Sequence, residues 1–472
     1  MFALWANIRP SGGGPPLKKY MRKSDDMECI LMKERIIQFG EGGFLRSFVD
    51  MFVNIMNEKG LFDGKVVVVQ PIAKGLVDVL NAQNGVYHQY LRGIENGEVI
   101  NQMTEVHSIS RGINPYTDYQ EYLKLAHNPD MRFIVSNTTE AGIEYLGTES
   151  LNDAPPKSFP AKLTALLYER YKAGLDGFII LCCELIDHNA DFLKEYVHKY
   201  AKLWSLGEDF EKWLDEKNSF SNTLVDRICT GYPKDEAQKL CAELGCEDKL
   251  INTAEIFHLW VIEGDYEDEL PLKKAGINVI WTKDVTPYKK RKVRILNGAH
   301  TSMVLAARLY GLSTVGECLN DEKVSAFLKK ALDEEIIPTL GSTDEDKIFG
   351  AAVLERFSNP FVKHQLLSIA LNSVSKFRAR VLPTILEYRD KFGKLPKCLT
   401  MSLAALIEFY RTDEANDGEE IMQFMKTAEV KDILKREDYW SEDLSFMAEE
   451  IEKTVSLIEA SGMSAYYEEA LS

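Results

Sequence analysis

A short apolar stretch that runs into three glycines near the start of the chain limits what this protein can fold into. Residues 36–39 (IIQF) suit a buried strand, residues 40–43 (GEGG) suit a tight turn, and residues 44–57 show helical periodicity. Glycines let a backbone approach a pyrophosphate, and free N–H groups at a helix N-terminus favour its charge. The segment predicts a dinucleotide-binding unit. A plain strand-to-helix turn is the alternative, because Leu45 replaces the last glycine of G-x-G-x-x-G.

Alternating strand and helix signals continue from this unit to the middle of the chain. Continuous apolar runs, typical of strands buried in a parallel sheet, occur at residues 133–136 and 177–183, and further strands are predicted within residues 65–72 and 276–285. Helical periodicity lies between them, for example at residues 116–126 and 162–173. This alternation predicts an α/β fold with a Rossmann-like, doubly wound sheet, whose ligands bind beyond the carboxyl ends of the strands.

The residues that follow the second strand leave the choice of dinucleotide open. An acidic residue at this position would bind the adenosine ribose of NAD. Gln70 and Pro71 stand there instead, and Lys74 would suit the 2′-phosphate of NADP. Charge alone therefore does not distinguish the two dinucleotides.

The chain changes character after residue 285, where helical patterns continue almost to the C-terminus. A chain of 472 residues is also too long for one ordinary core. We therefore expect a poorly ordered N-terminal tail over residues 1–32 and a dinucleotide-binding domain over residues 33–285. An all-α substrate and catalytic domain is expected over residues 286–472.

Composition argues against several classes of function. The net charge of −17 disfavours nucleic acid as the main partner, because phosphate binding requires basic surfaces. No apolar run approaches the ~20 residues of a membrane span, and the N-terminus has no secretory signal pattern. The 8 cysteines lack zinc-ligand spacing, so we expect reduced thiols, no metal and a cytoplasmic location. The choice between a monomer and a small homo-oligomer stays open.

A long helix that begins at Thr286 and ends at Gly311 carries the most informative side chains of the second half. Thr286 is placed to cap its start, and Gly311 suits the left-handed residue past its end. Lys292, Asn297 and His300 have the spacing K-x4-N-x2-H, which puts them within an arc of about 140° at about 100° per residue. One face thus combines a base, a neutral donor and an imidazole. A basic amphipathic helix with a core histidine is the alternative interpretation.

Several motifs occur in an order that resembles one enzyme family. They are G-x-G-G-F-x-R at residues 40–46, SNTTEAG at 136–142, VDRI at 225–228, WVIEG at 260–264, K-x4-N-x2-H at 292–300 and RFSNP at 356–360. From residue 35 onward the chain resembles the polyol-specific long-chain dehydrogenase/reductase family, that of mannitol dehydrogenase and the hexuronate reductases. Within it, IIQFGEGGFLR, CELID and HLWVIEG are most similar to members that reduce tagaturonate to altronate with NADH and without a metal.

The resemblance implies NAD as the cofactor, a hexuronate sugar acid as the substrate, and a set of site residues. Those implied in cofactor binding are Ile37, Gly40, Glu41, Gly42, Gly43, Phe44, Arg46, Thr138 and Glu140. Those implied in catalysis are Lys292, Asn297 and His300, and those implied in substrate binding are Glu184, Arg356, His364 and Lys376. Glu184 departs from the family pattern, because mannitol dehydrogenases carry there an asparagine that stabilises the oxyanion.

Elementary chemistry suggests a role for each catalytic candidate. Oxidation of a secondary alcohol requires a base for the hydroxyl proton, donors for the developing alkoxide, and a nicotinamide to take the hydride. Lys292 in its uncharged form would be that base, and the cationic run at residues 289–294 would favour loss of its proton. Asn297 would donate to the substrate oxygen, and His300 would hold a neighbouring hydroxyl or orient the lysine.

A sugar acid also brings a carboxylate, which an acidic protein must meet with local positive charge. Candidates in residues 356–380 are Arg356, Lys363, His364, Lys376 and Arg380, and for Lys363 a solvated helix face is the preferred interpretation. For neighbouring Asp226 and Arg227, a structural ion pair under the site is predicted, with a catalytic role as the alternative.

Three other functions stay open at this point. A sibling enzyme of the family, either a fructuronate reductase or a hexitol dehydrogenase, would share the same motifs. A non-catalytic NAD-binding regulator would keep the fold without the chemistry, although the intact lysine, asparagine and histidine argue against it. A nucleic-acid binder would use the basic run at residues 289–294, but the overall charge makes that interpretation weak.

Overall fold

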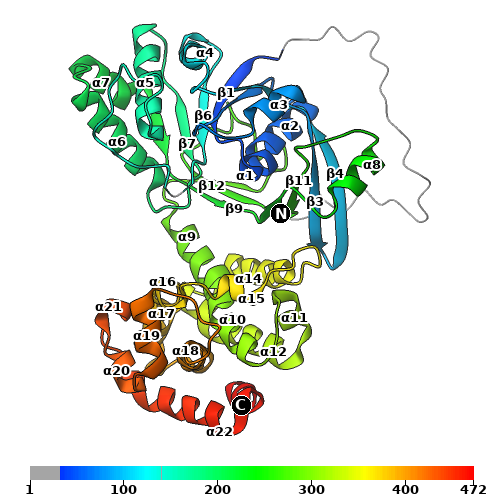
Figure 1. The fold of residues 1–472 in the computed structure, drawn as a ribbon, viewed down its shortest axis with the longest axis vertical. Helices are drawn as coiled ribbons and strands as arrows, with labels where there is room; N and C mark the ends of the chain where they lie inside the picture. The colour runs from blue at the N-terminus through cyan, green and yellow to red at the C-terminus, as the bar shows by residue number, and fades with distance from the viewer. Residues whose placement is uncertain (1–31, 140) are drawn as a thin grey trace.

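The computed structural model describes residues 32–139 and 141–472, so the predicted N-terminal tail lies outside the described residues except for Met32. Figure 1 shows two lobes, with sheets and helices from the first half of the chain above and helices from the second half below. The predicted fold class, a Rossmann-like α/β part followed by a mostly helical part, is confirmed.

A six-stranded sheet with the order β5-β2-β1-β6-β7-β8 forms the centre of the first lobe, and all of its neighbouring strands are parallel. Its strands are β1 (Glu34–Phe39), β2 (Lys65–Val69), β5 (Ile109–Ile113), β6 (Phe133–Ser136), β7 (Ile179–Cys182) and β8 (Ser219–Ser221). The strand order runs outward in opposite directions from β1 and β6. The ligand crevice of such a sheet lies at this switch point.

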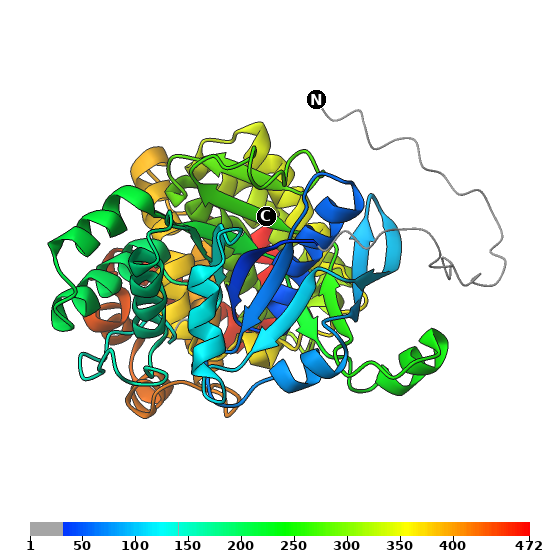
Figure 2. The ribbon, with the colours of Figure 1, turned by 90° about the horizontal axis from the view of Figure 1, so that it is seen from above.

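Alternate side chains of these strands enter two separate cores, because successive residues of a strand point to opposite faces. Ile36 and Val66 face one core together with Phe48 and Phe52. Ile37 faces the other core. The first core is covered by α1 (Gly43–Leu45), η1 (Arg46–Asp50) and α2 (Met51–Glu58). The second is covered by α4 (Tyr119–Lys124), η2 (Leu125–His127), α5 (Phe159–Lys172), α6 (Asn189–Leu203) and α7 (Glu208–Lys217), and Figure 2 shows α5–α7 on one side of the strands.

Two further sheets, which we did not predict, extend the first lobe, together with α3 (Val77–Ala82) and α8 (Ala237–Leu244). One has the order β10-β11-β3-β4, with bounds Cys229–Gly231, Asn252–Glu255, Tyr87–Glu95 and Glu98–Val106. The other has the order β13-β12-β9, with bounds Val279–Thr282, Leu259–Glu263 and Thr223–Asp226. The hairpin of β3 and β4 turns at Asn96 and Gly97, both left-handed, and it reaches toward the second lobe (Figure 1). An Asn-Gly pair between alternating strands is a strong hairpin signal.

The second lobe is helical, apart from one β-bridge between Thr314 and Gln365. Its first elements are α9 (Thr286–Lys292), η3 (Val293–Gly298), α10 (Ala299–Leu309), α11 (Val315–Asn320), α12 (Glu322–Lys330), η4 (Ala331–Ile336), α13 (Ile337–Leu340), α14 (Asp344–Phe357) and α15 (Leu366–Ile369). They are followed by α16 (Ser373–Arg380), α17 (Leu382–Phe392), α18 (Lys397–Tyr410), α19 (Glu419–Thr427), α20 (Val430–Leu434), α21 (Glu437–Trp440), η5 (Ser445–Met447) and α22 (Ala448–Leu471). Helices α10 and α18 are buried along most of their length and pack together at the centre.

The predicted long helix is present, but it differs from the expectation at its start and in its middle. Thr286 does not cap it: the helix begins at Thr286, and the side chain of Asp284 accepts the N–H of Thr286 at 2.8 Å. Gly311 has the predicted left-handed conformation past the end, with φ of +105°. Between α9 and α10 the chain forms the π-helix η3, whose wider turns change the angles between side chains on either side of it.

None of the helices in the described residues is long and apolar enough to cross a membrane. The cysteines at positions 182, 183, 229, 241, 246, 318 and 398 are free thiols, and Cys29 lies outside the described residues. Within residues 32–139 and 141–472 there is no group of at least three His, Cys, Asp or Glu side chains arranged to hold a metal ion.

Candidate active site

The glycine turn after β1 is an open backbone cradle at the switch point of the sheet. Gly40 has a φ of +122°, and a Cβ there would lie 3.0 Å from the carbonyl oxygen of Asn137. A Cβ at Gly43 would lie 2.8 Å from Oδ1 of Asn252, whose amide donates to the Gly43 carbonyl at 2.8 Å. A Cβ at Gly42, in contrast, would meet nothing within 4 Å. The turn is thus closed by protein behind Gly40 and Gly43 and open in front of Gly42, as a pyrophosphate cradle requires.

Two residues predicted to bind the cofactor hold this turn from behind. Ile37 is fully buried in the core beneath the sheet. Arg46 is buried as well, donating from Nε to the Glu41 carbonyl at 3.2 Å and from Nη1 to the Leu250 carbonyl at 2.5 Å. Both residues therefore shape the turn, whereas Phe44 lies at the start of the helix and stacks on Phe48 with ring centroids 5.0 Å apart.

The carboxyl ends of β6 and β7 line a cavity of about 350 Å³ beside the turn. The residues at this cavity are Asn137, Thr139, Ala141 and Leu185. Thr138 lies between two of them, and Glu140, also predicted to bind the cofactor, lies outside the described residues. The polar run after β6 is thus placed where a Rossmann fold binds its ligand.

Glu184, predicted to contact the substrate, supports this loop. Its side chain is buried and accepts from the Ser136 hydroxyl at 3.1 Å, and from the N–H and hydroxyl of Thr138 at 3.0 and 3.1 Å. Burial raises the pKa of the Glu184 carboxyl despite these donors. Because its oxygens are engaged by the β6 loop, the carboxylate positions the cofactor side of the site.

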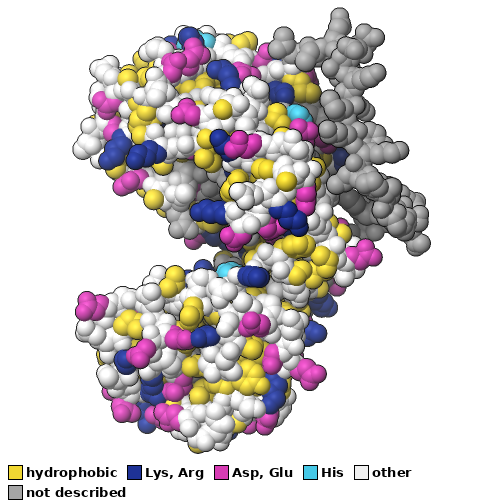
Figure 3. Space-filling model, turned by 45° about the vertical axis from the view of Figure 1, so that its right-hand side comes forward, with side chains coloured by type: hydrophobic (Ala, Val, Ile, Leu, Met, Phe, Trp, Pro, Cys, Tyr) yellow, Lys and Arg dark blue, Asp and Glu magenta, His cyan; other side chains and the backbone are white. Residues whose placement is uncertain are grey.

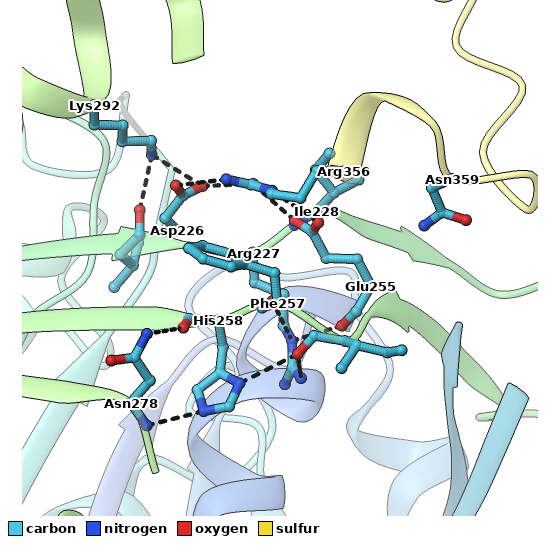
Figure 4. A network of polar contacts seen from close by, with 12 residues as sticks. Asp226, Arg227, Ile228, Glu255, Phe257, His258, Asn278, Lys292, Arg356 and Asn359 are labelled. Carbon is cyan, nitrogen blue, oxygen red and sulfur yellow. Dashed lines mark hydrogen bonds and ion pairs between the residues drawn. The ribbon is translucent and has the colours of Figure 1, made fainter. Parts of the chain in front are cut away.

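Lys292 reaches across from the helical lobe to the first lobe, as Figure 4 shows. Its Nζ donates to the carbonyl of Val225 at 2.9 Å and lies 3.7 Å from Oδ1 of Asp226. The side chain is 16% exposed, so the amine is sheltered but reachable. An ammonium beside a carboxylate at the end of a strand is the form that gives a proton to a substrate oxygen.

Arg356 from α14 closes this group into a buried ion cluster (Figure 4). Its guanidinium donates to Asp226 through two bonds of 3.0 Å and to Glu255 through bonds of 2.9 and 2.8 Å. Burial would raise the pKa of the Asp226 carboxyl, but Lys292 and Arg356 outweigh it and hold that pKa below its ordinary value. Arg356 was predicted to bind the substrate; with two carboxylates on its guanidinium, its position is instead that of a link between the lobes.

The cationic run around Lys292 is neutralised by partners. Lys289 pairs with Asp187, and Lys290 pairs with Glu387 at 3.1 Å. Arg291 pairs with Asp346 at 2.6 Å, and Arg294 donates to Glu387 at 3.0 Å. These cations were expected to favour loss of the proton from Lys292. Each of them forms an ion pair with a carboxylate, whose negative charge offsets its positive charge.

The predicted ion pair between Asp226 and Arg227 is wrong. Adjacent strand residues point to opposite faces, so the two side chains leave the backbone in different directions. Arg227 donates to the carbonyls of Glu255, Ile256, Phe257 and Ser47 at distances of 2.5–3.2 Å. Burial is the main reason that its pKa falls to about 10.

His300 lies at the centre of a second cluster on the helical lobe. Its ring stacks on Phe357 at 4.6 Å between centroids and meets the ring of His364 at 5.1 Å. The pKa of His300 is lowered to about 3, mainly by burial and additionally by the charges of His364, Arg380, Arg356 and Lys376. The imidazole is therefore neutral near pH 7, and its buried Nε2 has no hydrogen-bond partner in the described residues.

Two groups of this region have no polar partner in the described part of the chain. The side-chain amide of Asn297 makes no hydrogen bond there, and neither does the guanidinium of Arg380, which also forms no ion pair. Burial lowers the pKa of Arg380, and burial followed by the charge of Arg380 lowers the pKa of Lys376. Lys376 donates only to the carbonyl of Ile369 at 2.8 Å. Unpaired cations around a neutral imidazole are suited to an anion.

The two clusters face the space between the lobes. Arg356 connects them, because it binds the carboxylate beside Lys292 and its charge also acts on His300. Figure 3 shows the surface hollowed between the lobes, with basic and histidine side chains on the wall of the lower one. The structure thus groups Lys292 with Arg356, and His300 with His364 and Lys376, but it places Glu184 under the cofactor loop and Lys363 on the exposed surface.

Sequence reasoning missed two residues of the site. Glu255 lies at the end of β11, and Asn252 begins that strand and holds the glycine turn from 209 positions away. No local pattern marks either residue, because their partners are brought close only by the folded sheets. The Asn-Gly turn at residues 96 and 97, which joins β3 to β4, was the available signal for this sheet, because β3 is the partner of β11.

The parallel sheet, the open glycine turn and the helical second lobe define the class as a two-lobed protein of the dinucleotide-binding fold. Comparison with known families then places the chain. Residues 34–274 match the Mannitol dehydrogenase Rossmann domain, and residues 284–461 match the Mannitol dehydrogenase C-terminal domain. The protein belongs to the mannitol dehydrogenase family, which confirms the resemblance seen in its motifs.

Curated relatives and solved structures agree with this assignment. Altronate oxidoreductase of Escherichia coli O6:K15:H31 (strain 536 / UPEC) is 48% identical over 454 residues, covering 90% of this chain and 94% of the relative. Altronate oxidoreductase of Enterobacter sp. (strain 638) is 45% identical over 470 residues, covering 93% and 97%. A substrate-free D-sorbitol dehydrogenase has a TM-score of 0.81 at 24% identity, covering 92% of this chain and 95% of that one. Pseudomonas fluorescens mannitol 2-dehydrogenase, in a ternary complex with NAD and D-mannitol, has a TM-score of 0.71 at 21% identity, covering 93% and 94%.

Proposed function

We propose that this oxidoreductase interconverts tagaturonate and altronate, with NADH as the reductant and NAD as the oxidant. The names of the relatives at 45–48% identity support this substrate pair. The observation that carries the proposal is the unpaired guanidinium of Arg380, beside His300 and Lys376 on the lobe that holds Lys292. A hexitol has no charge to offer these cations, whereas a hexuronate brings a carboxylate.

In the reductive direction, Lys292 gives a proton to the ketone oxygen. The Asp226 carboxylate and the Val225 carbonyl hold the ammonium at the end of β9, so the proton donor is positioned before the substrate arrives. Asn297, whose amide has no partner in the described residues, donates an N–H to the same oxygen as charge develops. After transfer, the partly exposed amine regains a proton from solvent. In the oxidative direction the uncharged amine accepts the hydroxyl proton.

The neutral imidazole of His300 suits a hydroxyl or carboxylate oxygen of the sugar. Its Nε2 is a donor or an acceptor according to the tautomer, and it has no competing partner in the described residues. Arg380, Lys376 and His364 surround it and bind the carboxylate end. The substrate is thus held at one end by cations and at the other by Lys292, which fixes the reacting carbon relative to the first lobe.

The glycine turn is the place for the dinucleotide. Gly42 leaves the cradle open, and the backbone of residues 42 and 43 presents N–H groups at the start of a helix that continues to the end of α2. When bound, NADH supplies the hydride. Glu184 holds Thr138 and thereby keeps the β6 loop in place, so that Asn137 and Thr139 line the cavity beside the glycine turn.

The substrate is tested by following NADH oxidation with tagaturonate, fructuronate and fructose at equal concentrations. We expect the highest kcat/KM for tagaturonate. A preference for fructose would assign the protein to the hexitol dehydrogenases instead, and a preference for fructuronate would assign it to the sibling reductase. No turnover of any of the three, together with tight NADH binding, would favour the non-catalytic regulator.

The carboxylate site is tested by Arg380→Ala, with Arg378→Ala as the matched control on the same helix. Arg378 donates to the Asp438 carbonyl at 3.0 Å and points away from His300. A charge-assisted hydrogen bond contributes about 1.5–3 kcal/mol, so we expect Arg380→Ala to raise KM for tagaturonate roughly 10- to 100-fold. The control should stay within about twofold. An equal, small effect of both variants would contradict the assignment of the carboxylate to Arg380.

A further inference from the structure

The carboxyl end of β2 has a polar residue, but its side chain is turned back on its own loop. Gln70 is buried, donates from Nε2 to the Ile72 carbonyl at 2.8 Å, and accepts the N–H of Val77 at 3.3 Å. In a Rossmann fold this position commonly holds the acidic residue that binds the adenosine ribose. Here both the amide nitrogen and the amide oxygen are held by the backbone of the same loop.

A carboxylate from another part of the chain occupies the neighbouring space. Glu41, the second residue of the glycine turn, is 8% exposed and reaches over to the loop after β2. A Cβ at Gly75 would collide with its Oε1 and would lie 2.5 Å from Oε1 of Gln70, so both oxygens converge on this glycine. The carboxyl group also accepts the backbone N–H of Leu76. Gly75 is therefore the residue that makes room for Glu41 at the end of β2.

We propose that Glu41 selects NAD over NADP by taking the place of the missing acidic residue at the end of β2. This inference rests on the proposed binding of a dinucleotide at the glycine turn. A carboxylate there accepts a hydrogen bond from the 2′-hydroxyl of the adenosine ribose and repels a 2′-phosphate.

Lys74 is the residue that would oppose this selection by attracting a 2′-phosphate. Its charge is placed less favourably than that of Glu41 to act on the ligand. Its side chain is exposed, so water and salt screen its charge, whereas the charge of Glu41 acts from a largely buried position. The net field at the end of β2 is therefore set by the carboxylate. A 2′-phosphate would meet it at short range.

The experiment is a fluorescence titration of the purified protein with NADH and with NADPH, which needs no sugar substrate. The wild type is expected to bind NADH at least about tenfold more tightly, a difference of about 1.4 kcal/mol. In Glu41→Gln the ratio of the NADPH to the NADH dissociation constant should fall to about three or less, mainly through tighter NADPH binding. Asp78→Asn is the matched control, because Asp78 lies in the first turn of α3 near the same edge and its loss changes the net charge equally. Its ratio should equal that of the wild type.

Gly75→Ala provides an independent variant, because its methyl group displaces Glu41 without removing the carboxylate. It should lower the ratio in the same direction. Equal binding of both dinucleotides by the wild type, or an unchanged ratio in folded Glu41→Gln and Gly75→Ala, would overturn the role of Glu41 and leave the proposed function intact. Failure of the wild type to bind either dinucleotide would overturn both proposals.

Discussion

At the scale of single residues, the chemistry of this protein depends on how charges are paired. Lys292 shares the Asp226 carboxylate with Arg356, whereas its cationic neighbours along the helix pair with other carboxylates, and Lys290 and Arg294 share Glu387. Arg380 has no such partner in the described residues. A guanidinium that forms no ion pair and lies beside a neutral imidazole is suited to an anionic ligand.

Replacement of Lys292 by alanine removes the proposed proton donor. General acid–base catalysis contributes about 10²- to 10⁴-fold, so kcat of Lys292→Ala for tagaturonate should fall by at least about 10²-fold while NADH binding is retained. Lys290→Ala is the control, because this lysine is on the same helix and pairs with Glu387 at 3.1 Å on the surface. Unchanged turnover in Lys292→Ala would refute the mechanism.

At the scale of elements, a π-helix adjusts the site. Segment η3 separates Lys292 from His300, and its last residue, Gly298, is where the end of α16 packs. A Cβ at Gly298 would lie 2.9 Å from the carbonyl oxygen of Arg380. The absence of a side chain therefore lets α16 approach closely enough to bring Arg380 beside His300.

Gly298→Ala should consequently disturb both packing and substrate binding. The added methyl group meets backbone rather than a flexible side chain, and overpacking of this kind costs about 1–3 kcal/mol of unfolding free energy. KM for tagaturonate should rise, while NADH affinity stays unchanged because the glycine turn is in the other lobe. Gly316→Ala, where a Cβ would meet nothing within 4 Å, is the control and should leave stability and KM unaltered. Equal KM values in the two variants, measured alongside chemical denaturation, would count against this role of Gly298.

At the scale of the whole molecule, buried polar contacts join the two lobes around the cleft. Arg356 of the helical lobe binds Asp226 and Glu255 of the first lobe, with all three side chains at most 5% exposed. Nearby, the amide of Asn359 donates to the Arg92 carbonyl on β3 at 3.1 Å, and Glu355 accepts the N–H of Gly97 at the tip of the hairpin. These contacts set the position of Lys292 relative to the cofactor lobe.

Arg356→Ala leaves two buried carboxylates without this cation and should lower the unfolding free energy by about 3–5 kcal/mol. In the wild type the pKa of Asp226 is lowered, so its contribution is present at neutral pH and is lost as the pH falls through that pKa. In the variant, burial raises the pKa of Glu255 further, so the folded state binds protons more readily than the unfolded state. The variant should therefore regain stability on mild acidification, as urea denaturation at several pH values will show.

Arg389→Ala is the control for this experiment, because the Arg389 side chain is 36% exposed and its ion pair, with Asp390 at 3.1 Å, lies within α17 and does not link the lobes. Its stability should follow that of the wild type at each pH. If Arg356→Ala lowers the free energy of unfolding as little as the control does, the ion cluster does not hold the lobes together.

Much of the architecture was predictable because it depends on local patterns. The run IIQF, the glycines after it and the apolar runs at β6 and β7 are local signals of strands and turns, and each is present in the structure. The helix that carries Lys292 was predicted for the same reason, although Asp284 rather than Thr286 meets its first free N–H. The sheet of β9, β12 and β13 was not predicted as a whole, because β9 ends at Asp226 and its partner β12 begins only at Leu259, so no local pattern links the two strands.

By itself the sequence determined the class of fold, the glycine turn and the helix bearing Lys292, Asn297 and His300, because hydrophobic periodicity and glycine placement act over a few residues. Tertiary structure alone decided which charges are paired. In the folded protein Asp226 pairs with Lys292 and Arg356, and Glu184 lies beneath the β6 loop. Arg380 has no partner in the described residues. The physical reason is that an ion pair depends on distance in space, and Arg356 and Asp226, which are 130 positions apart, meet only after the lobes have packed.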